Sequence, residues 1–133
     1  MYEGACNCGS LSYRFSEPLA TALCHCRHCQ KTSGSAFSVN LIVKEADIEI
    51  SGQEARYEDR SDAGALVYRC FCPKCGSSVR SILTSMNGAS AVKAGTLDDP
   101  AMVRPTVQFW RRSAQPWLGE LNEIEAFATT RGG

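Results

Sequence analysis

The chain of 133 residues lacks a net charge, an apolar run of membrane-spanning length and any strong compositional bias. Fourteen basic side chains balance fourteen acidic ones, so no overall field draws the protein to nucleic acid or to an anionic membrane. The segment from Met1 to Cys6 has no basic flank, apolar stretch or cleavage site. We therefore expect a cytoplasmic protein that binds neither nucleic acid nor a membrane.

The sequence also lacks a linker, a low-complexity tract and the pattern of a long helix. A hydrophobic content of 44% and a charged content of 21% are typical of an ordinary folded domain. We expect a single zinc-binding domain over residues 1–133, with a frayed tail at 126–133.

Short segments rich in alternating or β-forming residues, separated by turn residues, predict a mainly β fold. We expect strands at residues 11–15, 37–43, 47–50, 66–69, 78–83, 91–94 and 107–110. A short helix is expected at 27–32, because a Cys-x-x-Cys corner often starts one and Gly34 would end it. Strands then lead into and away from each group of cysteines.

Eight cysteines are the strongest chemical signal in the sequence, and they cluster at 6–8, 24–29 and 70–75. A reducing cytosol disfavours disulfides, and thiols this close in sequence do not suit most local disulfide geometries. The clusters are therefore interpreted as metal sites rather than as four disulfides.

Two Cys-Gly endings predict the first metal site. Residues 72–76 read Cys-Pro-Lys-Cys-Gly, and residues 6–9 read Cys-Asn-Cys-Gly. The glycine after each second cysteine permits a positive φ, which turns backbone N–H groups toward the sulfurs. Paired, the two motifs give a closed, structural tetrathiolate zinc site made of Cys6, Cys8, Cys72 and Cys75.

Three further thiols, those of Cys24, Cys26 and Cys29, lie within six residues of one another. They are enough to hold a second zinc ion while leaving one of its four positions open for chemistry. Arg27 and Lys31 lie beside this cluster and are candidates for steering an anion toward it.

His25, His28 and Cys70 have more than one interpretation. Either histidine could ligate the second metal, but three thiolates need only one more partner, which water supplies. The histidines could equally face solvent, a substrate or a thiolate. Cys70 could close the second site, act as a nearby nucleophile or fill the core, and we favour a core or near-site position.

Two other residue pairs have simpler structural interpretations. Asp98 and Asp99 precede a proline and are expected to shape a turn rather than to act as an acid–base pair. Trp110 and Trp117 are expected to pack in the core rather than to form the wall of a substrate pocket.

The ordered motifs are Gly-Ala-Cys-Asn-Cys-Gly at 4–9, Cys-His-Cys-Arg-His-Cys at 24–29, Phe-Cys-Pro-Lys-Cys-Gly at 71–76 and Gly-Thr-Leu-Asp-Asp-Pro at 95–100. Together with Trp110 and Trp117, this set resembles the glutathione-dependent formaldehyde-activating enzymes, the GFA family, which share a domain with centromere protein V. The resemblance covers nearly the whole chain. In one departure, Gln108 stands where many members carry a histidine.

The resemblance implies an Mss4-like fold of folded antiparallel sheets and two zinc ions per chain. Cys6, Cys8, Cys72 and Cys75 match the structural site of the family, and Cys24, Cys26 and Cys29 match its catalytic site. The implied activity is that of a zinc-dependent carbon–sulfur lyase acting on a small thiol adduct such as S-(hydroxymethyl)glutathione, made from glutathione and formaldehyde. The alternative is a non-catalytic zinc-binding module for a protein partner, in which Cys70 or a histidine closes the second site.

Overall fold

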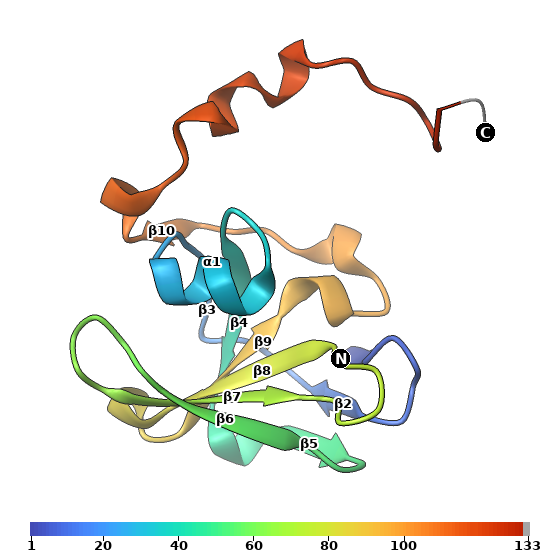
Figure 1. Cartoon of the computed structure of the whole chain (residues 1–133). Helices are drawn as coiled ribbons and strands as arrows, with labels where there is room; N and C mark the ends of the chain where they lie inside the picture. Colours follow the sequence, from blue (N-terminus) through green and yellow to red (C-terminus); the bar gives the residue numbers. More distant parts are fainter. Residues whose placement is uncertain (132–133) are drawn as a thin grey trace.

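The computed structural model describes residues 1–131 and consists of two β-sheets with one short α-helix (Figure 1). The smaller sheet has the order β1-β2-β5 and is formed by β1 (Tyr2–Ala5), β2 (Ser12–Phe15) and β5 (Ile48–Ser51). The larger sheet has the order β10-β3-β4-β9-β8-β7-β6. Its strands are β3 (Ala20–Cys24), β4 (Ser38–Val43), β6 (Ala55–Arg60), β7 (Leu66–Phe71), β8 (Ser78–Leu83), β9 (Ala89–Lys93) and β10 (Val107–Phe109).

The mainly β, Mss4-like fold with antiparallel sheets is confirmed. All described strand pairs are antiparallel except β10 with β3, which run parallel. Each of the seven predicted strands overlaps an observed one. Three strands were not predicted: β1, β3 and β6. Their sequences contain Gly, Ala or a run of charged residues, which carry little β signal.

The α-helix α1 (Arg27–Ser33) confirms the helix expected at 27–32. Cys26 is its N-cap, and the Cys26 sulfur accepts a hydrogen bond from the backbone N–H of Cys29. Gly34 ends the helix in the left-handed conformation, with φ of 64°. The 3-10 helices are η1 (Glu45–Asp47), η2 (Thr84–Met86), η3 (Ala94–Thr96), η4 (Pro100–Met102), η5 (Arg111–Ser113) and η6 (Pro116–Glu123).

The main core lies where the small sheet packs on the large one. Leu11, Tyr13 and Phe15 contribute from the first hairpin, and they pack with buried aliphatic side chains of the larger sheet, including Leu41, Val43, Val79 and Val92. Burying each large apolar side chain stabilises the fold by about 1.5–3 kcal/mol. Cys6 and Cys72 belong to this same cluster, so the first cysteine group lies at the edge of the core.

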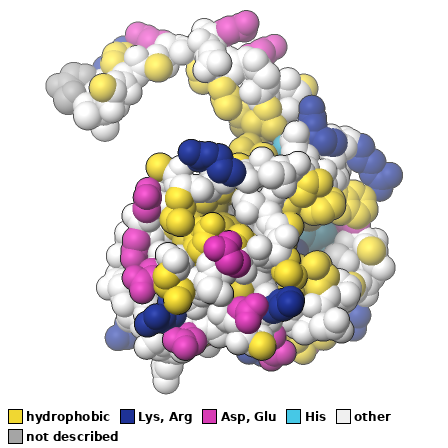
Figure 2. Space-filling view, turned by 180° about the vertical axis from the view of Figure 1, so that it is seen from behind, with side chains coloured by type: hydrophobic (Ala, Val, Ile, Leu, Met, Phe, Trp, Pro, Cys, Tyr) yellow, Lys and Arg dark blue, Asp and Glu magenta, His cyan; other side chains and the backbone are white. Residues whose placement is uncertain are grey.

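The C-terminal segment leaves the body of the protein after η5, as Figures 1 and 2 show. Trp117 is 49% exposed, so the prediction that it packs in the core is wrong. Other apolar side chains of this segment, Leu121, Ile124 and Phe127, are also exposed. Residues 126–131 of the expected frayed tail are exposed, and 132–133 lie outside the described residues.

Two smaller observations complete the fold. Asp99 precedes η4 as its N-cap residue and accepts a backbone bond from Met102, so the expected turn is present. Within residues 1–131, no helix has both the length and the apolar character needed to cross a membrane.

Candidate metal centres

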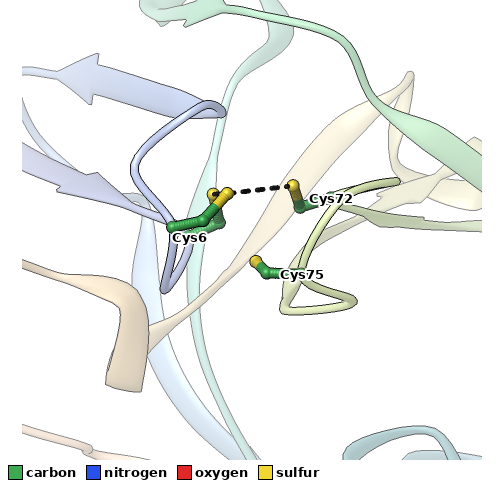
Figure 3. A group of neighbouring side chains, drawn as sticks. Cys6, Cys72 and Cys75 are labelled. Carbon is green, nitrogen blue, oxygen red and sulfur yellow. Dashed lines mark hydrogen bonds between the residues drawn. The ribbon is translucent and has the colours of Figure 1, made fainter.

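The first cysteine group joins the tips of two hairpins. Cys6 and Cys8 lie in the turn between β1 and β2, and Cys72 and Cys75 lie in the turn between β7 and β8. The four sulfurs lie within 4.8 Å of one another. Figure 3 shows the labelled sulfurs of Cys6, Cys72 and Cys75 pointing toward a common centre from the two loops. The pairing expected from the sequence is therefore present in space.

Both turns contain the same backbone hydrogen bond, from a glycine N–H to the carbonyl of a cysteine. The N–H of Gly9 donates to the Cys6 carbonyl at 3.0 Å, and the N–H of Gly76 donates to the Cys72 carbonyl at 2.9 Å. Gly9 has φ of 81° and Gly76 has φ of 79°, a left-handed conformation that disfavours residues with a Cβ. The positive φ expected at both glycines is confirmed.

Neighbouring donors, the Ser10 hydroxyl foremost, lower the pKa of Cys72, and the pKa of Cys75 is shifted in the same direction. The N–H of Leu11 lies 3.3 Å from the Cys6 sulfur, and the N–H of Lys74 lies 3.4 Å from the Cys72 sulfur. The hydroxyl and the backbone N–H of Ser77 lower the pKa of Cys75 to about 5. Because the thiolate is the form that ligates metal, the lowered pKa values favour metal binding at Cys72 and Cys75.

The second cysteine group occupies the corner between β3 and α1. Cys24 ends β3, Cys26 caps α1, and Cys29 lies in its first turn. Their three sulfurs lie within 4.8 Å of one another, and no fourth His, Cys, Asp or Glu of residues 1–131 joins them. Hydrogen bonds from Cys24 and Cys26 lower the pKa of Cys29, and Ser38 and Lys93 act in the same direction.

Neither His25 nor His28 belongs to the group formed by the three thiols. His25 is buried, and its Nε2 lies 2.8 Å from Oε1 of Gln108. Within residues 1–131, Nδ1 of His25 has no hydrogen-bond partner. His28 uses both ring nitrogens, with Nδ1 3.2 Å from Asp59 and Nε2 3.0 Å from Asp62.

Cys70 lies in the core, as favoured from the sequence, and not in the second group. Successive side chains of a strand point to opposite faces of a sheet. The guanidinium of Arg69 lies 3.8 Å from the Cys29 sulfur, so Cys70, the next residue of β7, points away from that cluster. Burial raises the pKa of the Cys70 thiol.

The cations that face the second cluster come from β7 and β9 and were not predicted from the sequence. Arg69 reaches Cys29 while its Nε donates to Asp59 at 3.2 Å. Lys93 donates to Asn40 at 2.7 Å, and its charge acts on the thiols of the cluster. Burial lowers the pKa of Lys93 to about 8. Arg27 and Lys31, the predicted steering residues, are exposed on α1.

A cavity of about 290 Å³ adjoins this cluster. Cys24 and Cys29 form part of its lining, together with Arg69, Lys93 and the half-buried Trp110. The expectation that Trp110 packs in the core rather than forming the wall of a pocket is therefore wrong. The position of Trp110 could not be inferred from the sequence, because this residue follows β10, and β10 lies beside β3 only through the parallel pairing of the two strands.

Gln30 ties the helix to the chain that follows β10. Its buried amide Nε2 donates to the carbonyl of His25 at 2.8 Å and to the carbonyl of Ser113 at 3.0 Å. Its Oε1 accepts from Gln115 at 2.8 Å. These bonds fix α1, and with it Cys29, against the segment that ends the folded body.

The two groups fit the ligand preference of zinc, which takes four thiolates in closed sites and three protein ligands in open ones. Seven soft thiol donors in groups of four and three match that chemistry. Both groups could therefore hold a metal ion. A mainly β chain with two such clusters belongs to the class of small cysteine-rich domains with candidate metal sites.

Comparison with known proteins narrows this class. A family model described as glutathione-dependent formaldehyde-activating enzyme matches residues 1–113, and the chain belongs to this family. The match ends where the C-terminal segment leaves the body. The crystal structure of a Rhodobacter sphaeroides protein has a similar fold, with a TM-score of 0.59 and 19% sequence identity, covering 80% of this chain and 98% of that one. A search of curated proteins gives no match.

Proposed function

We propose that the protein is a zinc-dependent carbon–sulfur lyase of the GFA type that acts on a small thiol adduct such as S-(hydroxymethyl)glutathione. The observation that carries this proposal is a three-thiol cluster whose members Cys24 and Cys29 line a cavity. In the forward direction a thiol and an aldehyde combine. A carbon–sulfur bond forms, the carbonyl double bond becomes single, and the thiol proton ends on the carbonyl oxygen. The reverse reaction releases both molecules.

The three cysteines Cys24, Cys26 and Cys29 would hold the catalytic zinc. A zinc ion bound there would favour the thiolate form of the substrate thiol at neutral pH. Arg69 and Lys93 place two cationic groups in the wall of the same cavity. Their charges offset those of the thiolates and stabilise the negative oxygen that develops as the carbon–sulfur bond forms.

Cys6, Cys8, Cys72 and Cys75 would hold a structural zinc, which gives two zinc ions per chain. Four protein thiols leave no open position, so this metal joins the two hairpin tips without taking part in the reaction.

The enzyme is favoured over a non-catalytic module because the expected closing ligands point elsewhere. Cys70 faces the opposite side of β7, and both ring nitrogens of His28 lie against carboxylates. Nε2 of His25 is engaged by Gln108, and neither ring nitrogen of His25 is grouped with the three sulfurs. A protein-binding module would need one of these residues to close the second site.

X-ray absorption at zinc, with and without glutathione, tests this proposal. The purified protein should show about 3.5 sulfur ligands per zinc on average, rising to about 4 when glutathione is added. Cys70→Ser is the matched control and should behave as the wild type does. If wild-type zinc is already saturated with sulfur, and opens only in Cys70→Ser, then Cys70 closes the site and the module is correct.

A further inference from the structure

The cavity beside the three-thiol cluster is larger than formaldehyde requires. An apolar cavity of about 150 Å³ in a protein core holds one benzene molecule. The volume of about 290 Å³ is close to twice that, so an aldehyde with a single carbon atom, even beside a zinc ion and the sulfur of a bound thiol, would leave much of it empty. The excess space calls for a larger group on the substrate.

The floor of the cavity is a row of residues across the larger sheet. The strand registers align Ile42 with Ala91, Ala91 with Ser81, and Ser81 with Arg69, and all four line the cavity. Along β3 the lining runs from Cys24 to Ala20, a span of about 13 Å at 3.3 Å per residue. The cavity is therefore elongated and leads away from the cluster.

The two cations that line the cavity, Arg69 and Lys93, already have partners at the end near the cluster. Lys93 is bonded to Asn40, and Arg69 is paired with Asp59 and lies against Cys29. Apart from Asn40, whose amide is bonded to Ser38 and Lys93, and the hydroxyl of Ser81, the remaining lining is apolar, and includes Leu19, Ala22, Leu83, Met86 and Phe109. Such a surface offers no partner to a carboxylate or an ammonium group, but it suits a hydrocarbon group.

The hydroxyl of Ser81 is a second indication that a ligand belongs here. Ser81 is 2% exposed and lines the cavity, yet its oxygen has no hydrogen-bond partner among residues 1–131. A buried hydroxyl without a partner costs free energy, and Ser81 lies opposite Arg69, so the carbonyl oxygen of an aldehyde at the end near the cluster would give this hydroxyl a partner.

We propose that the aldehyde used by this chain carries an apolar substituent, a ring or a medium-length alkyl chain, which occupies the cavity. The proposal rests on the proposed lyase function and names its substrate class. The carbonyl group lies at the end near Cys24 and Cys29, and the substituent extends toward Leu83 and Met86. The charged body of a thiol such as glutathione stays outside, near Trp110, over whose ring Arg112 lies at 5.0 Å.

Binding of alcohols, which resemble the aldehyde without reacting, tests the proposal independently of turnover. The zinc-loaded protein carries Trp117→Phe, so that Trp110, which lines the cavity, is the remaining tryptophan. Its fluorescence is followed during titration with methanol, butanol, hexanol and benzyl alcohol. Affinity should rise about fourfold with each added methylene until the cavity is full. Affinity that does not depend on chain length would overturn the proposal.

Two substitutions change the cavity in opposite directions. Ala91→Leu fills it and should weaken hexanol binding at least about tenfold, given the loss of space for two or more methylenes. Leu83→Ala enlarges it and should allow affinity to keep rising in longer alcohols. Ala65→Leu, between β6 and β7, is the control and should bind as the parent does. Equal losses in Ala91→Leu and Ala65→Leu, or no extension in Leu83→Ala, would contradict the assignment.

The outcome separates this proposal from the lyase function. If glutathione adds no sulfur ligand to zinc, the proposed function fails whatever the alcohols do. If glutathione binds zinc but the alcohols show no dependence on length, then only the apolar substituent is wrong.

Discussion

Replacing Cys75 with serine isolates the contribution of the four-thiol cluster to folding. Cys75 is exposed, so the substitution opens no hole in the core and removes only a sulfur that faces the other three. The cluster joins distant parts of the chain, since Cys8 and Cys72 are 64 positions apart. The three-thiol cluster, by contrast, lies within a single corner between β3 and α1.

The size of the effect follows from this difference in loop length. Structural zinc supplies about 10 kcal/mol of folding free energy, which is comparable to the whole stability of a small domain, about 5–15 kcal/mol. The entropic cost of loop closure grows by about 0.6 kcal/mol for each doubling of loop length. The loop from Cys8 to Cys72 is longer than the loop from Cys24 to Cys29 by roughly 3.7 doublings. Chain entropy alone therefore makes the four-thiol cluster more stabilising by about 2 kcal/mol.

The assay combines zinc analysis with thermal unfolding followed by circular dichroism. Cys75→Ser should lose one zinc ion and most of the stability, whereas Cys24→Ser should lose one zinc ion and remain folded. Cys70→Ser, which buries a hydroxyl outside both clusters, should keep both ions and lose about 1–3 kcal/mol. Equal destabilisation by Cys75→Ser and Cys24→Ser would refute the division into a structural and a catalytic site.

Four further outcomes are expected. The purified protein should contain two zinc ions per chain by elemental analysis, and a value near one would disprove the two-site proposal. Because ligation releases the thiol proton, glutathione affinity measured by calorimetry should rise about tenfold per pH unit below the thiol pKa of about 8.5 and level off above it; a flat profile would exclude thiolate binding. Lys93→Met should lower kcat/KM for the adduct by about 10²–10³ with unchanged metal content, and undiminished turnover would remove Lys93 from the reaction. Gly4→Ala should cost about 1–3 kcal/mol in chemical denaturation, because its Cβ would lie 2.4 Å from the carbonyl oxygen of Thr96, and wild-type stability would show that the two segments separate easily.

How much of the fold could be predicted depended on where each strand lies. Strands with clear β-forming patterns, such as β4 and β8, were found from the sequence. β3 reads Ala-Thr-Ala-Leu-Cys and is a strand because β4 and β10 pair with it on both sides. β6 is a charged edge strand, and it is held by β7 alone. Local sequence carries little of that information.

The residues of the candidate site could likewise be predicted only in part. Its thiols were predictable because three of them lie within six residues and the other four form two short motifs. Arg69 and Lys93 could not be found, because they reach the cluster only when β7 and β9 take their places in the sheet. Trp117 was misplaced because its size suggests burial, whereas the chain leaves the body before that position.

The two clusters are linked mechanically through the hairpin of β7 and β8. Cys72 follows β7 directly, and the same strand carries Arg69 to the second cluster. β8 returns from the four-thiol turn and supplies Ser81 and Leu83 to the cavity wall. A metal ion bound at the tip of this hairpin would therefore also fix the register in which Arg69 and Ser81 lie opposite each other. In the proposed enzyme, the four-thiol site would thus support the reaction by holding the floor of the cavity in place, although its own ligands would not reach the substrate.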